Sequence, residues 1–144
     1  MSEAVEGIRV VALGTSVATS LATAYLADFG AEVVRVQTLG SEHTGDLEDS
    51  NVGPYHGEWN YWADFLDRNN KSVALGLAQD AGRQLVRKLI EKSDVFSTDL
   101  TDEALEVLSL SYSRISGVKP EIVYAACSCL GCHGPDVDIH NRGC

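Results

Sequence analysis

The sequence predicts an α/β fold in which a parallel sheet is flanked by helices. Short apolar runs alternate with segments of helical periodicity along most of the chain. The first run, the first periodic segment and the second run fit within about thirty residues, the length of a βαβ unit. The 144 residues, of which 44% are hydrophobic and 22% charged, suffice for one domain with its own core.

The first half of the chain contains the expected βαβ unit. An apolar run over residues 8–13 predicts a buried strand that ends at Gly14. Thr15 and Ser16 can cap a helix over 17–29, and Gly30 suits the position after its last turn. Residues 32–36 predict the second strand, which is parallel to the first because a helix connects them. Residues 38–62 carry four glycines and little periodicity, which predicts a long loop.

The second half continues the alternation. Strands are expected over 72–75, 94–97 and 122–126, and short helices over 102–108 and 111–118, the second of which Pro120 ends. Residues 78–92 predict the clearest helix, with Leu85, Val86, Leu89 and Ile90 on one face and arginines near the other. This order of elements predicts a Rossmann-like sheet, whose ligands bind at the carboxyl ends of the strands.

The charge of the chain argues against two classes of partner. The formal net charge is −10 and the pI is about 4.6. Such a surface repels phosphate backbones and anionic lipids, so we expect neither nucleic-acid nor membrane binding. A secretory signal has a basic segment before an apolar run, and the first ten residues, MSEAVEGIRV, have no such segment. A cytoplasmic protein with reduced thiols is therefore expected.

The segment CSCLGCH, Cys127 to His133, contains the C-x-x-C-H spacing of c-type haem attachment. A zinc site that also uses His140 or Cys144 is a second possibility. The third interpretation is a strand end with buried structural cysteines, of which Cys127 and Cys129 would share a face. We favour the third, because covalent haem is normally attached outside the bacterial cytoplasm and nothing else in the sequence indicates a haem cavity or a distal ligand. We also expect no metal.

Other motifs carry less information. No G-x-G-x-x-G follows the first strand, and Gln37 stands where a ribose-binding acid would be, which argues against NAD or FAD. The helix start at Ser16 could still offer N–H groups to a phosphate. His43 and His56 lie in the expected loop and are interpreted as surface residues. The acids between Asp99 and Glu106 are interpreted as solvated faces and helix-start acids.

Several segments together resemble the N-terminal part of a family III CoA-transferase of the CaiB/BaiF type. Residues 22–37, ATAYLADFGAEVVRVQ, resemble the family's A-T-x-x-L-A-D-x-G-A-x-V-I-K-V-E. The segment DRNNKSVALGL at 67–77 resembles N-R-G-K-R-S-x-A-L-D-L. Residues 105–135 resemble L-E-R-L-G-L-x-Y, then N-P-x-L-V-Y and S-x-S-G-F-G-x-x-G-P. The quoted segments, with GIRVVALG at 7–14 and AGRQLVRKLIEKSDVFSTDL at 81–100, follow the family's order. The C-x-x-C-H spacing then falls on the family's glycine turn, which makes it a coincidence of substitution.

The resemblance implies transfer of CoA between carboxylic acids through an acyl anhydride and a thioester on an aspartate. CoA or an acyl-CoA would be a substrate, and no permanently bound cofactor is implied. Residues 1–144 would form one CoA-binding, Rossmann-like domain that lacks the catalytic C-terminal part. Its partners would be an acyl-CoA, a carboxylic acid, and a second copy in a homodimer or the missing C-terminal segment.

The implied catalytic aspartate lies beyond residue 144, so the chain alone contains no catalytic residue and is expected to be inactive. Two alternatives stay open: a racemase-like member of the same family, and a non-catalytic, structural half of a tandem protein. The positions at which the resemblance implies contacts with CoA are Val17, Ala18, Thr38, Asn69, Asn70, Lys71, Ser72 and Leu100.

The chain also departs from the family at basic positions. Gln37 and Thr38 stand where an acid and a basic residue are found, and Val107 replaces an arginine. Residues 99–102 replace N-F-R-P, and Gly76 replaces an aspartate. Each arginine lost from a pyrophosphate removes charge-assisted hydrogen bonds worth about 1.5–3 kcal/mol, so CoA binding itself is in question.

Overall fold

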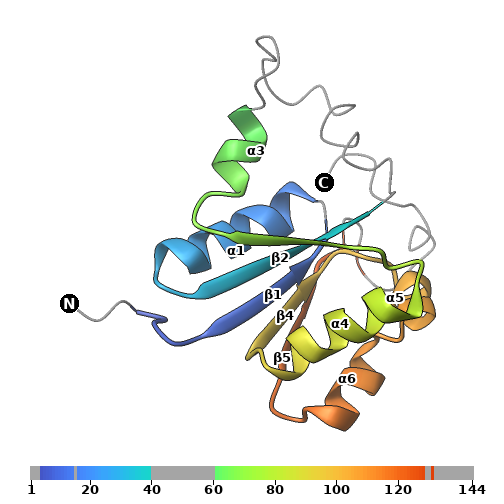
Figure 1. Cartoon of the computed structure of the whole chain (residues 1–144). Coiled ribbons are helices and arrows are strands. Elements are labelled where there is room, and N and C mark those ends of the chain that lie inside the picture. The colour runs from blue at the N-terminus through green and yellow to red at the C-terminus, as the bar shows by residue number, and fades with distance from the viewer. Residues whose placement is uncertain (1–3, 15, 40–60, 129–130, 132–144) are drawn as a thin grey trace.

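A computed structural model of the chain describes residues 4–14, 16–39, 61–128 and 131 (Figure 1). Its strands are β1 (Arg9–Leu13), β2 (Glu32–Thr38), β3 (Lys71–Leu75), β4 (Val95–Thr98) and β5 (Val123–Ala126). Its helices are α1 (Val17–Asp28), α3 (Tyr61–Leu66), α4 (Asp80–Glu91), α5 (Asp102–Leu108) and α6 (Tyr112–Val118). The predicted α/β fold with a flanked parallel sheet is confirmed.

The five strands form one sheet in the order β3-β2-β1-β4-β5, and every neighbouring pair is parallel. From β1 the chain moves outward through β2 to β3, and then returns to the opposite side of β1 with β4. The strand order therefore reverses between β1 and β4. In parallel α/β sheets this switch point opens a crevice at the carboxyl edge, where ligands bind.

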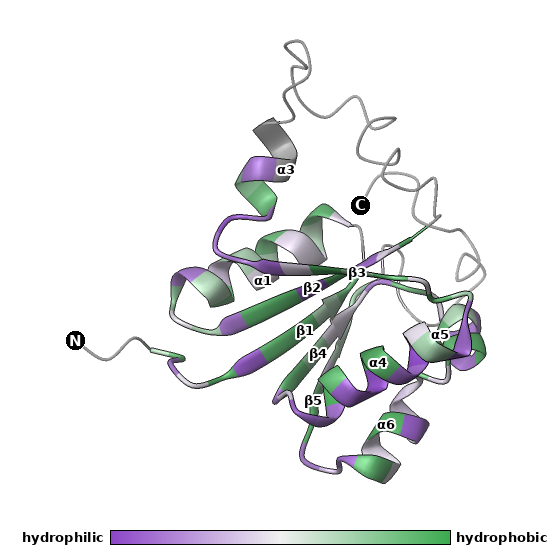
Figure 2. Ribbon diagram, in the orientation of Figure 1, coloured by the Kyte–Doolittle hydropathy of each residue, from purple (hydrophilic) through white to green (hydrophobic). Residues whose placement is uncertain are grey.

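Helices cover both faces of the sheet: α1 and α3 lie on one side, and α4, α5 and α6 on the other (Figure 1). Successive residues of β1 point to opposite layers because side chains alternate along a strand. Val10 packs with Val33 and Leu26 in the α1 layer, whereas Val11 packs with Val86 in the larger core under α4. Figure 2 shows β1 as hydrophobic over most of its length, as expected for a strand buried on both faces.

Helix α1 has well-defined ends. The Ser16 side chain accepts a hydrogen bond from the Thr19 N–H, which caps the first turn. Gly30 follows the helix at φ 101°, a left-handed conformation that closes helices and suits glycine. The buried face of α1 includes Thr23, whose hydroxyl donates to the backbone oxygens of Thr19 and Ser20 at 3.0 Å. These local bonds let hydroxyl side chains pack against the sheet without unpaired polar groups.

Helix α4 departs from its expected face. Of the residues expected on one face, Val86 and Ile90 are fully buried, whereas Leu85 is 48% exposed. Gly82 is also buried, and a Cβ added there would lie 2.2 Å from the Gly76 carbonyl oxygen. This close approach to the loop after β3 turns Leu85 outward, because the helix packs through its glycine.

Other differences concern the ends of elements. Strand β2 continues through Thr38, and a helix begins at Tyr61, within the region predicted to be a loop. The remaining predicted strands and helices are confirmed to within two residues. The predicted loop residues 40–60, with His43 and His56, lie outside the described residues. Among the described helices, none is long and apolar enough to cross a membrane.

Candidate functional site at the carboxyl edge

The switch point between β1 and β4 is occupied by a buried carboxylate. Asp99 follows the last residue of β4, and its Oδ2 accepts a hydrogen bond from the Ser16 backbone N–H at 2.5 Å. Both residues are 7% exposed. Ser16 is the N-cap of α1, so the carboxylate lies at the positive end of that helix. In many nucleotide-binding folds a phosphate takes this position.

Gly14 makes room for this carboxylate. A Cβ added to Gly14 would lie 2.3 Å from Asp99 Oδ1 and 2.5 Å from its Cγ. Such contacts are far shorter than van der Waals distances, so any larger residue would displace the Asp99 side chain. The glycine after β1 is therefore required by a close approach of Asp99, and not by a positive φ.

A buried cation accompanies the carboxylate. Arg35 of β2 is 8% exposed, and its Nη1 donates to Asp67 Oδ1. Burial lowers the pKa of the Arg35 guanidinium, and the charge of Asp99 opposes that shift. The pair with Asp67 and the field of Asp99 thus compensate a charge that water does not reach. The charge of Arg35 is therefore already offset by carboxylates of this chain.

The other strand ends supply hydroxyl and backbone groups. The Thr98 hydroxyl accepts from the Leu100 N–H at 3.2 Å, and the Cys127 N–H donates to the Thr98 carbonyl at 2.8 Å. Cys127 is half-buried with a free thiol. No group of three or more metal-ligating side chains occurs among the residues described by the structure. Cys129, Cys132, His133, His140 and Cys144 lie outside these residues.

Four of the sequence-predicted CoA contacts lie near this edge. Val17 and Ala18 form the first turn of α1, and the second of them is exposed. Thr38 ends β2 opposite Leu75 of β3. Leu100 is half-buried behind Asp99 and packs against the larger core. These four residues lie along one edge of the sheet.

The other four predicted contacts lie at the opposite end of β3. Asn69 has φ 61° and donates to Asp28 at 2.7 Å, and the Lys71 ammonium donates to Glu32 Oε1 at 2.6 Å. The Asn70 amide is buried without a partner among the described residues, and Ser72 is exposed. Lys71 and Leu75 are four positions apart, which spans about 13 Å of strand. The structure therefore does not bring this group together with Val17, Ala18, Thr38 and Leu100.

Asp99 was missed as a functional candidate. Its interpretation as part of a solvated acidic face is wrong, because its side chain is buried against the α1 N-terminus. Asp102 and Glu103 do lie in the first turn of α5, as predicted for helix-start acids. The available signal was position: Asp99 comes two residues after the strand expected over 94–97, and directly follows the observed β4 (Val95–Thr98), which neighbours β1.

Comparison with known proteins assigns this arrangement to a family. The model of CoA-transferase family III matches residues 5–141. An acyl-CoA transferase of Fusarium pseudograminearum is 33% identical over 92% of this chain and 30% of its own length. A cinnamoyl-CoA:phenyllactate CoA-transferase of Clostridium sporogenes is 26% identical over 92% of this chain and 32% of its own length.

The fold is also similar to that of solved structures. A CaiB/BaiF family protein from Brucella suis superposes with a TM-score of 0.81 and 23% identity, covering 96% of this chain and 36% of that one. The chain therefore spans about a third of the length of the relatives that it matches. This agrees with the predicted partial, N-terminal portion of a larger domain.

Proposed function

Since this chain belongs to CoA-transferase family III, we propose that it is the CoA-binding, Rossmann-like part of a transferase that moves CoA between carboxylic acids. The observation that carries the proposal is the reversal of strand order between β1 and β4, because ligands of parallel α/β sheets bind in a crevice at the carboxyl end of such a switch point. The first turn of α1 borders this crevice, and the N–H groups of Val17 and Ala18 are suited to a phosphate or thioester oxygen. Thr38 and Leu100 would contact the remainder of CoA.

In this proposal the described residues bind and the catalytic residue lies elsewhere. The resemblance implies that an aspartate beyond residue 144 attacks the acyl-CoA thioester and carries the acyl and then the CoA group. Binding by this chain would hold the thioester in position for that attack. We further propose that a homodimer or the C-terminal segment completes the site, with an acyl-CoA and a carboxylic acid as substrates.

A second candidate function rests on Asp99. Its carboxylate fills the place where α1 would receive an anion, and the resemblance puts an asparagine at this position. A negative charge about 5 Å from a phosphate costs on the order of 3 kcal/mol at an effective dielectric constant of about 20. This favours a non-catalytic, structural half of a tandem protein that has lost CoA binding.

Calorimetric titration with CoA and acetyl-CoA distinguishes the two functions. The informative variant is Asp99→Asn, which keeps an oxygen for the Ser16 N–H and removes the charge. Asp102→Asn is the matched control, because it removes one charge from an exposed position in the first turn of α5. If the chain is a CoA-binding part, the wild type binds saturably, and Asp99→Asn tightens binding by about tenfold or more, worth about 1.4 kcal/mol.

The other results have equally definite meanings. Equal tightening by Asp102→Asn would mean that net charge, and not the α1 edge, controls affinity. If the wild type binds CoA and Asp99→Asn has the same affinity, the CoA site does not lie at this edge of the sheet. Absence of binding by the folded wild type and by Asp99→Asn would favour the structural half.

A further inference from the structure

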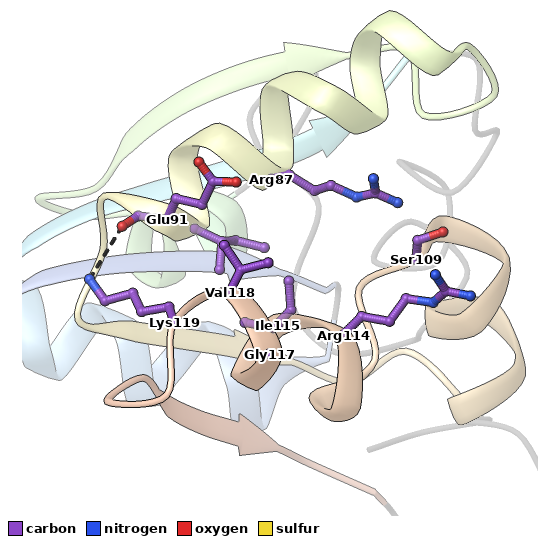
Figure 3. A pocket seen from close by; sticks show the side chains of 9 residues that line it. Arg87, Glu91, Ser109, Arg114, Ile115, Gly117, Val118 and Lys119 are labelled. Carbon is purple, nitrogen blue, oxygen red and sulfur yellow. Dashed lines mark hydrogen bonds between the residues drawn. The ribbon is translucent and has the colours of Figure 1, made fainter.

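A pocket of about 330 Å³ lies between α4 and α6, away from the crevice at the carboxyl edge (Figure 3). We name it the α4–α6 pocket. Helix α4 runs back from the carboxyl edge, and its last turn contributes Ile90 and Glu91. Helix α6 leads to the first residue of β5, so Val118 and Lys119 also lie toward the amino edge of the sheet. A ligand here would not occupy the proposed CoA crevice.

The lining of this pocket is cationic although the chain is strongly acidic. It contains Arg87, Arg114 and Lys119 but only one acid, Glu91, in a chain of net charge −10. Lys119 Nζ donates to the Glu91 carbonyl oxygen at 3.3 Å, and Arg114 Nε lies 3.6 Å from Glu106 Oε2. Both members of the second pair are more than half exposed, so that contact is weak.

Arg87 carries the strongest evidence for a ligand. Its Nε is buried and has no hydrogen-bond partner among the described residues. A buried donor that lacks a partner is costly, and a turn of the guanidinium toward an anion in the pocket would give this donor an acceptor. In Figure 3 the guanidinium groups of Arg87 and Arg114 extend toward the same end of the pocket, where Ser109 also lies.

The middle of the pocket is apolar, between the arginines at one end and Glu91 and Lys119 at the other (Figure 3). Ile90 and Ile115 are buried beneath it, whereas Val118 is 66% exposed. Figure 3 shows Val118 and Ile115 between the two helices, next to the arginines. The pocket thus combines an apolar surface with two guanidinium groups, and its volume falls at the lower end of the range of about 300–1,000 Å³ for small-molecule sites.

We infer that the α4–α6 pocket binds a small organic carboxylate that carries an apolar chain. The planar guanidinium of Arg87 matches a carboxylate through paired hydrogen bonds, with Arg114 as a second donor. The chain of the ligand covers Val118 and Ile115. This site is separate from the proposed CoA crevice and does not depend on CoA binding.

Three probes test the apolar and the charged part of this inference separately. Octanoate has both parts, acetate lacks the apolar chain, and octan-1-ol lacks the charge. Titration is followed by calorimetry and by the backbone amide NMR signals of α4 and α6. Octanoate is expected to bind saturably, and acetate and octan-1-ol at least about tenfold more weakly.

Arg87→Gln and Arg114→Gln should each weaken octanoate binding by about tenfold, which is the effect of one charge-assisted hydrogen bond. Lys88→Gln is the matched control, because Lys88 is an exposed cation on the same helix that does not line the pocket.

Each contrary result overturns the inference. Octanoate binding that survives both arginine variants, or that Lys88→Gln weakens equally, would exclude the arginine site. Acetate binding as tight as octanoate would exclude the apolar part, and absence of saturation would exclude the pocket altogether. Arg114 is exposed, so its variant tests the site even if Arg87→Gln perturbs folding. A parallel CoA titration of Arg87→Gln should match the wild type, which keeps failure of this inference distinct from failure of the proposed function.

Discussion

At the scale of single residues, Tyr124 of β5 joins three parts of the larger core. Its hydroxyl donates to the Leu110 carbonyl at 3.0 Å, in the turn between α5 and α6. Its ring meets Phe96 and Tyr112 edge-on, with centroid distances of 5.3 and 5.6 Å. Burial, followed by the charges of Asp102 and Glu106, raises the pKa of Tyr124 to about 12.

The raised pKa predicts a loss of stability at alkaline pH. The unfolded chain releases this proton near pH 10, whereas the folded chain retains it until about pH 12. The unfolded state therefore binds fewer protons between these values, and the free energy of unfolding falls as pH rises. Because Tyr124 is only half-buried, solvent screening reduces the effect to on the order of 1 kcal/mol.

Tyr124→Phe should flatten this dependence. Urea denaturation between pH 7 and the alkaline range is expected to show about 1 kcal/mol lower stability at pH 7, from the lost hydrogen bond. The difference from the wild type should then shrink above pH 10. Tyr25→Phe is the control, because Tyr25 is 51% exposed on α1. An unchanged slope in Tyr124→Phe would mean that another group causes the alkaline loss.

At the scale of elements, two helical glycines have opposite roles. Gly82 packs α4 against the backbone of Gly76, and an added Cβ would lie 2.2 Å from that carbonyl oxygen. Gly117 is exposed in α6, and an added Cβ there would meet nothing within 4 Å. One glycine is required by the packing of the helix on the loop after β3, and the other is only a weak point in a short helix.

Alanine substitution should therefore change stability in opposite directions. Gly82→Ala is expected to destabilise by at least about 2 kcal/mol, because the backbone that it contacts cannot rotate away. Gly117→Ala should stabilise by about 0.5–1 kcal/mol through its helix propensity. Urea denaturation of the two variants measures both effects. A tolerated Gly82→Ala would indicate that α4 can move away from the sheet without loss of the core.

At the scale of the whole molecule, the net negative charge destabilises the folded state, whereas several ion pairs stabilise it. Arg9 and Lys71 both pair with Glu32, and Arg68 pairs with Asp28, but most of these side chains are partly exposed. Exposed pairs contribute about 0–1 kcal/mol each. The net charge of −10 repels itself over the whole surface. Repulsion is therefore expected to outweigh the attraction of the pairs at neutral pH.

Added salt should raise the melting temperature at pH 7. Between about 20 mM and about 500 mM NaCl the Debye length falls from roughly 20 Å to roughly 4 Å, which screens the long-range repulsion. Thermal unfolding is expected to shift upward by about 2–5 °C, corresponding to about 1 kcal/mol. Near the pI of about 4.6 the shift should disappear. A lower melting temperature with salt at pH 7 would mean that the ion pairs dominate.

Local patterns predicted most of the secondary structure because their causes are local. Ser16 and Gly30 mark the ends of α1 through capping and a left-handed backbone, which need no distant partner. The apolar run before Gly14 predicted β1 for the same reason. The exposure of Leu85 could not be predicted, because it depends on the contact of Gly82 with a loop that is not part of α4.

The candidate site shows the same division. The sequence by itself determined the alternation of strands and helices, the resemblance to CoA-transferases and the edge at which Val17, Ala18, Thr38 and Leu100 lie. Only the tertiary structure decided that Asp99 reaches Ser16, 83 residues earlier. The physical reason is strand order: β4 pairs with β1 through burial and hydrogen bonds over the whole sheet, which no local pattern encodes.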